Sequence, residues 1–377
     1  MMDELTVEGP FAYENWKALL SGKQPLVYFE YPFFTDAHIT GEISEGLGPY
    51  RIINAVPITR SFRPTLVLRV SQHLEHKVPF MKKTKEDNYH GGFLADEIAA
   101  LFSLFLGIRL KSGDANREFS VGGDPFGRPR SYGFYDDPIL PEIPKRPILK
   151  SALGTHSLDI TNSLSFFPQV SPHDAIAIIR AARLYQEAVW MVESTPELSW
   201  ILLTSAIETV AQKWRDEKES PLERLRASRP ELEAKLKEHG DEEFVLAVAN
   251  DIAPYMGATK TFVDFLMEFM PPPPSKRPDK FAQLSWETPY LKKVMTLIYK
   301  YRSRALHGGF PFPAPMCEPP HYYAGREKAP EETSESLATG MRGGVWLAKD
   351  VPILLHTFEY IARNAIINWW RTLETKS

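Results

Sequence analysis

The sequence predicts an α+β protein, with a mixed α/β domain over residues 1–165 and an all-α helical bundle over residues 166–377. Short β-branched and aromatic runs, separated by Gly and Pro, fill the N-terminal third and are typical of strands. In the second half, a hydroxyl residue followed by proline precedes each of three long apolar segments, as is common at helix starts. The two halves therefore differ in secondary structure.

The net charge, the cysteine count and the lengths of the apolar runs exclude several classes of protein. The chain has 44 Lys and Arg against 48 Asp and Glu, a net charge of −4, so a nucleic-acid partner would have to meet a local basic face. The one cysteine, Cys317, excludes an intramolecular disulfide and a cysteine-built metal site. The sequence has no run of about 20 apolar residues and no secretion signal. We therefore expect a cytoplasmic protein that does not span a membrane.

The N-terminal elements follow from local patterns. Strands are expected within residues 25–72, and residues 93–110 form an apolar helical segment in which Gly107 marks the end. Residues 112–147 are dense in Gly, Pro and Asp, which predicts irregular structure or short strands. We place the linker to the second domain within residues 145–170.

The helical half contains explicit start signals. The expected N-caps are Ser171, Thr195 and Thr288, each followed by proline. Further helices are expected over residues 221–256, 258–269 and 346–373. In the last of these, regular helix is expected to begin near Asp350. Two proline-rich loops interrupt them, at residues 270–278 and 311–344. A loop as long as the second is more often functional or disordered than architectural.

The segment from Thr288 to Gly309 carries the most information. At about 100° per residue, Arg302 falls at the centre of the apolar face of this helix. Lys293, Lys300 and Arg304 fall on the opposite face. A guanidinium cannot lose its charge on burial, so Arg302 needs an anion or a cleft to reach into.

His307 lies five residues after Arg302, and Gly308 and Gly309 mark the helix end. On a regular helix the two side chains would diverge by about 140°. They can share one site only if the last turn loosens or if they reach the site from different depths.

A partner for Arg302 is expected on an earlier helix, over residues 198–214. Nearly all positions of this segment are apolar except a polar stripe of Thr204, Ser205, Glu208, Thr209 and Gln212. One interpretation is an ordinary solvent-facing stripe. The other is that Glu208 faces Arg302 across the bundle and positions its guanidinium.

These residues carry a family resemblance. The segment from Ile298 to Gly308, with its RSxxxHG form, resembles the signature of the HEPN superfamily and is similar to the Apea-like HEPN subgroup. The SAIETV segment around Glu208 resembles the acidic position of that subgroup. The resemblance covers about residues 170–375, and the N-terminal domain is not assigned to a family.

The resemblance implies a metal-independent endoribonuclease that acts as a homodimer on RNA, with no cofactor. Arg302 and His307 would be catalytic, and Glu208, Ser303 and Arg304 would support them. The N-terminal domain would then recognise a trigger or substrate. A role in defence or stress follows only by analogy.

Two other functions stay open. The bundle could be a catalytically inactive HEPN-type module that binds RNA or protein. Alternatively, the N-terminal domain could hold a small-molecule or metal site, with the bundle serving dimerisation alone. His73, Glu75, His76 and His90 are the candidate metal ligands. Their spacing matches no zincin motif, so surface histidines are the favoured interpretation.

Overall fold

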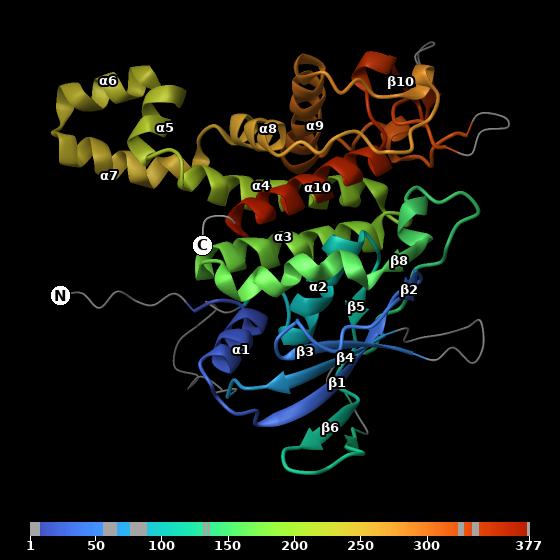
Figure 1. Cartoon of the computed structure of the whole chain (residues 1–377). Coiled ribbons are helices and arrows are strands. Elements are labelled where there is room, and N and C mark those ends of the chain that lie inside the picture. Colours follow the sequence, from blue (N-terminus) through green and yellow to red (C-terminus); the bar gives the residue numbers. More distant parts are fainter. Residues whose placement is uncertain are drawn as a thin grey trace.

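The computed structural model describes residues 8–55, 66–75, 89–130, 133, 136–322, 328–333 and 339–374. A sheet lies at one end of the molecule, and layers of helices stack on it toward the other end (Figure 1). The expected α+β class, with strands first and helices after, is confirmed.

The sheet is built around β1 (Val27–Phe34). Its strand order is β3-β4-β1-β6-β7, and the short β5 also pairs with β1. The pairings are antiparallel, with Phe29 opposite Val70 in β4. The other strands are β3 (Tyr50–Asn54), β4 (Leu66–Gln72), β5 (Lys111–Ser112), β6 (Arg117–Ser120) and β7 (Arg128–Pro129). The short strands within residues 112–147 match the expectation for that segment.

Two helices cover the sheet. α2 (Leu94–Leu106) is almost wholly buried, and it ends at Gly107, which adopts the left-handed conformation with φ of 70°. α1 (Phe11–Leu20) was not expected from the sequence. Its first amide groups, those of Phe11 and Ala12, donate to the buried carboxyl of Glu97 in α2. Burial raises the pKa of Glu97 to about 8, and the contact ties α1 to α2.

The expected linker is part of the packed structure. It contains a short strand, β8 (Thr155–Ser157), which pairs in parallel with β2 (His38–Thr40). The turns of 3-10 helix at Lys150–Leu153 and Leu158–Gln169 bury Leu164 and Phe167. One hydrophobic core contains residues from both sides of position 165. The sheet and the bundle therefore share a core, and the division at that position stays a prediction.

The second half is helical, as expected. Its helices are α3 (Pro172–Met191), α4 (Pro196–Asp216), α5 (Pro221–Ser228), α6 (Pro230–His239), α7 (Glu242–Ile252), α8 (Ala258–Glu268), α9 (Thr288–Gly308) and α10 (Leu355–Glu374). In Figure 1, α5, α6 and α7 project from the rest of the bundle. They have a small core of their own, formed by Leu225, Val245 and Ala249.

Two of the three expected N-caps, Ser171 and Thr195, occupy the N-cap position, and one of them forms the capping hydrogen bond. The hydroxyl of Ser171 accepts the amide N–H of Asp174, as a cap should. Thr195 occupies the N-cap position of α4, but its side chain makes no capping hydrogen bond. At α9 the N-cap is Glu287, and Thr288 is already helical. Proline at the first turn fixes helix starts even where the hydroxyl does not cap.

The expected start of the last helix was wrong. Residues 346–354 contain the end of a hairpin between β9 (Thr339–Met341) and β10 (Gly344–Trp346), then a 3-10 turn at Ala348–Asp350. Pro352 disfavours helical backbone at Val351, whose φ of −132° and ψ of 58° lie outside the helical region. The helix therefore begins only at Leu355.

The described part of the second prolyl loop is built into the fold. The carboxyl of Glu331 is buried and accepts bonds from Arg277 Nε at 2.8 Å and from the amide of Leu284 at 2.9 Å. The indole of Trp200 donates to the carbonyl of Met316 at 3.0 Å. These contacts give the loop an architectural role. Across the described ranges, no helix is long and apolar enough to cross a membrane.

Candidate functional site between helices α4 and α9

The amphipathic character of α9 places Arg302 where the sequence predicted. Leu291, Val294, Met295 and Ile298 are buried against the bundle, while Lys300 on the other face is exposed. Only 18% of the Arg302 side chain is exposed to solvent. Its guanidinium therefore lies at the margin of the core and needs a partner there.

That partner is Glu208 of α4. Arg302 Nη2 donates to Glu208 Oε2 in an ion pair, and 22% of the Glu208 side chain is exposed. The prediction that these two residues face each other across the bundle is confirmed. An ion pair so little exposed is screened weakly by solvent and holds the guanidinium in one orientation.

Sequence reasoning missed a third member of this cluster, Tyr299. Its hydroxyl donates to Glu208 Oε1 at 2.8 Å, and its ring centroid lies 5.7 Å from Arg302 Cζ. Burial raises the pKa of Tyr299, and the bond to the Glu208 carboxylate raises it further. Tyr299 precedes Arg302 by three positions, so both lie on one side of the helix. That spacing could have identified it.

Three other stripe residues of α4 have partners on their own helix. Thr204 and Thr209 donate their hydroxyls to backbone carbonyls one turn earlier, and Gln212 donates to Asp216 on the same helix. Among the described stripe residues, Glu208 is the one whose side chain forms hydrogen bonds to another helix, α9. Thr204 is buried, and the other four stripe residues are half-buried. The interpretation of an ordinary solvent-facing stripe therefore fits neither Thr204 nor Glu208.

Part of the Arg302 guanidinium is not occupied by this contact. Its Nε is buried and has no hydrogen-bond partner in the described part of the chain. Because Glu208 offsets the charge of Arg302, the positive field at this end of the helix comes mainly from exposed neighbours. These neighbours include Lys300 and Arg304. The Cζ atom of Arg304 lies 5.0 Å from the ring centroid of Phe310.

His307 lies in the last turn of α9, which stays regular through Gly308 and ends at Gly309 with φ of 65°. The last turn does not loosen, which was one of the two ways in which Arg302 and His307 could share a site, so their side chains diverge by about 140° around the helix. His307 is exposed, and its imidazole makes no hydrogen bond to another described residue. One chain therefore presents the two groups on different sides of the helix.

The last turn of α9 emerges from the bundle together with apolar neighbours. Leu306 is 48% exposed and Phe310 is 58% exposed, whereas Ser303, one turn earlier, is half-buried. At about 100° per residue, Leu306 lies at the edge of the apolar face of α9. Its exposure beside His307 leaves an apolar surface next to the motif.

The N-terminal histidines have structural roles. His73 is buried, and its ring nitrogens contact the carbonyl of Lys23 at 2.7 Å and the hydroxyl of Ser71 at 3.0 Å. His90 is also buried, so the expectation of surface histidines was wrong for both. His76 lies outside the described residues. Within the described ranges, no three His, Cys, Asp or Glu residues gather to hold a metal ion.

Comparison of the chain with known protein families, with curated proteins and with solved structures finds no match.

Coupling between Glu208 and Arg302 is expected to contribute about 1–3 kcal/mol to the free energy of unfolding, because hydrogen bonds to charged groups are worth about that much. Glu208→Ala, Arg302→Ala and the double variant form the cycle, measured by urea unfolding. The exposed pair of Arg342 with Glu318 serves as the control and should give under about 1 kcal/mol. Equal coupling in the two pairs would contradict this expectation.

Proposed function

We propose that the protein is a metal-independent endoribonuclease that acts as a homodimer, with one cleft shared by the α9 helices of two copies. The observation that carries this proposal is the arrangement at the end of α9. Arg302 is held in place by Glu208, and the imidazole of His307 is exposed on the next turn. The RSxxxHG sequence that resembles the HEPN signature spans both residues.

The chemistry suits these side chains because RNA carries its own nucleophile. The 2′-oxygen attacks the adjacent phosphorus, the 5′-oxygen leaves, and the products are a 2′,3′-cyclic phosphate and a 5′-hydroxyl. His307 transfers a proton between these oxygens, since an imidazole exchanges protons near neutral pH. The guanidinium of Arg302 stabilises the negative charge that develops on the phosphate, and the hydroxyl of Ser303 supplies a further donor.

Two copies are needed because one helix separates the catalytic groups. Arg302 faces α4, and His307 lies about 140° around the helix from it. A second copy, docked on the exposed Leu306 and Phe310, would bring its own His307 toward the first copy's Arg302. The same contact would cover apolar surface that one chain leaves open to water.

The shared site is tested with heterodimers of two differently tagged chains. One chain carries Arg302→Gln, which removes the charge but keeps an N–H donor for Glu208, and the other carries His307→Ala. In a shared cleft, one of the two sites keeps both groups. We therefore expect about half of the wild-type RNA cleavage rate from the purified heterodimer.

The matched control pairs a wild-type chain with a chain that carries both substitutions. A shared cleft then has no complete site, so this heterodimer should be inactive. The opposite pattern, activity in the control and none in the first heterodimer, would place each site within one chain. A chain that stays monomeric at micromolar concentration would also contradict the shared cleft.

One observation favours the alternative of a non-catalytic module. Glu208 offsets the charge of Arg302 and Tyr299 packs beside the pair, which would suit a purely structural contact. In that case the exposed cations of α9 would bind RNA without cleaving it. Both heterodimers and the wild type would then bind RNA equally and leave it intact.

A further inference from the structure

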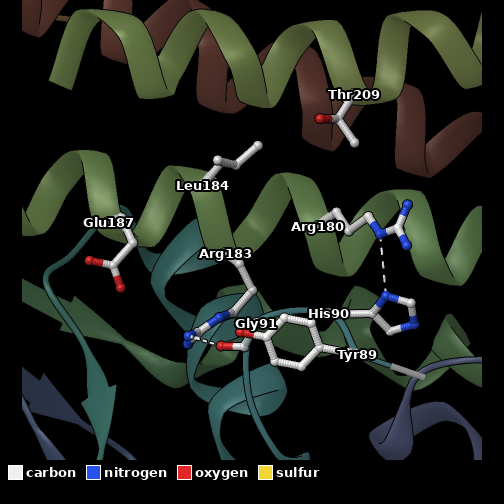
Figure 2. Close-up of a pocket in the computed structure, with 8 residues that line it drawn as sticks. All are labelled: Tyr89, His90, Gly91, Arg180, Arg183, Leu184, Glu187 and Thr209. Atoms are coloured by element: carbon white, nitrogen blue, oxygen red, sulfur yellow. Dashed lines mark hydrogen bonds between the residues drawn. The ribbon is translucent and has the colours of Figure 1, made fainter. Parts of the chain in front are cut away.

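A pocket of about 650 Å³ lies at the junction of the sheet region and the bundle. Figure 2 shows the segment that precedes α2, with Tyr89, His90 and Gly91, on one side of α3, and Thr209 of α4 on the other. Its further lining residues come from α3, namely Arg180, Arg183, Leu184 and Glu187. Its volume lies within the range of sites for small molecules.

The hydrogen bond between Arg180 and His90 fixes the form of the imidazole. Arg180 Nε donates to His90 Nδ1 at 3.2 Å (Figure 2), so Nδ1 must carry a lone pair. Burial and the nearby charge of Arg180 lower the pKa of His90 to about 4. The neutral ring therefore carries its hydrogen on Nε2, which is buried and has no partner among the described residues.

Arg183 leaves a second donor unmatched. Its two amino groups donate to Gln186 Oε1 and to the carbonyl of Gly91, so the guanidinium is fixed in place. Its Nε is buried and has no acceptor within the described ranges. A buried donor without an acceptor is unfavourable. Figure 2 shows that Arg183 lies at the opposite end of the pocket from Arg180 and His90, with the ring of Tyr89 between them.

The charge balance of the pocket is positive. Glu187, the one acid among the described lining residues, is paired with Lys111 Nζ at 2.8 Å. No ion pair joins Arg180 or Arg183 to a carboxylate of the described chain. Two guanidinium charges therefore remain, which matches the double charge of a phosphomonoester above its second pKa of about 6.

We propose that this pocket binds a phosphomonoester, with the phosphate held by Arg180 and the Nε2–H of His90, while Arg183 at the other end of the pocket adds to the positive charge (Figure 2). The planar guanidinium of arginine, with its several N–H groups, and the N–H of a neutral imidazole are both suitable donors to phosphate oxygens. The organic part of the ligand lies against Leu184 and the ring of Tyr89, which is 70% exposed. This site does not depend on the ribonuclease function and shares no residue with the cluster around Arg302.

Binding is tested by calorimetry at pH 7.5, with adenosine 5′-monophosphate as the probe and adenosine as its uncharged counterpart. The monophosphate should bind about 10- to 100-fold more tightly, because charge-assisted bonds to the phosphate contribute that much. Inorganic phosphate should compete with it. Equal affinity for the two probes would overturn the proposal.

Variants locate the site. Arg180→Met and His90→Phe should each weaken binding of the monophosphate by about tenfold or more. Arg51→Met, which removes an exposed cation of β3 outside the pocket, should leave the affinity unchanged. Thermal unfolding provides a second measurement. The monophosphate should raise the melting temperature of the wild type and of Arg51→Met equally, and that of Arg180→Met less at the same ligand concentration. Equal affinity in Arg180→Met and Arg51→Met would overturn the proposal.

The source of the phosphate is distinguished by competition. An oligodeoxynucleotide with a 5′-phosphate competes if the site takes the end of a nucleic acid, and its 5′-hydroxyl counterpart does not. Competition by free mononucleotides alone assigns the site to a small molecule. Competition by the 5′-hydroxyl oligonucleotide as strongly as by the phosphorylated one would contradict recognition of a phosphomonoester.

Discussion

Replacement of His307 by alanine is expected to lower the rate of RNA cleavage about 10²–10⁴-fold, the usual contribution of a general acid or base. RNA affinity should change little, because on this proposal the imidazole acts mainly in the transition state, whereas the exposed cations of α9 would contact the phosphates. Single-turnover cleavage gives the rate, and fluorescence anisotropy with a non-cleavable RNA gives the affinity.

His239 offers a matched control for this substitution. It is an exposed histidine in the last turn of α6, on the projecting group of helices. His239→Ala should leave both the rate and the affinity unchanged. Equal cleavage by His307→Ala and His239→Ala would remove His307 from the mechanism and favour the binding-module function.

A single 2′-deoxy substitution at the cut site should reduce cleavage of that bond to the limit of detection, because it removes the nucleophile itself. The effect should exceed that of any one protein side chain, since residual catalysis survives loss of a single group. The substrate is one RNA with a mapped cleavage site, compared with the same RNA deoxy-substituted one nucleotide away.

The ends of the products provide the second part of this test. Cleavage by 2′-oxygen attack leaves a 2′,3′-cyclic phosphate or the monoester formed by its hydrolysis, which mass spectrometry identifies. Continued cleavage of the deoxy-substituted bond, with a 3′-hydroxyl product, would show that water attacks the phosphate and that another mechanism operates.

Much of the fold was predictable because local patterns agree with the tertiary structure. The strands within residues 25–72 and the helix ending at Gly107 follow from the spacing of apolar residues and from the Gly and Pro residues that bound each segment. The sequence did not predict α1, because this helix depends on contacts with residues far along the chain. Its first amides, for example, donate hydrogen bonds to Glu97. The start of α10 at Leu355 depends on Pro352 and on a hairpin that the pattern of apolar residues does not indicate.

The site was predictable to the extent that helix geometry alone defines it. Arg302 and Glu208 are charged residues on apolar surfaces, and burial requires such residues to find partners. The exposure of Leu306 beside His307 depends on where the neighbouring helices end, and periodicity carries no such information. The pair of Arg180 with His90 joins positions 90 residues apart, so only the folded chain reveals it.

The central claim, metal-independent cleavage of RNA by this chain, is tested most directly by incubating the wild type with one labelled RNA in excess EDTA. The reaction is run beside Arg302→Gln and His307→Ala prepared in the same way. The account predicts cleavage by the wild type at the rate seen without EDTA and little cleavage by either variant. Intact RNA in EDTA with activity restored by Mg²⁺, or equal cleavage by all three proteins, would contradict it.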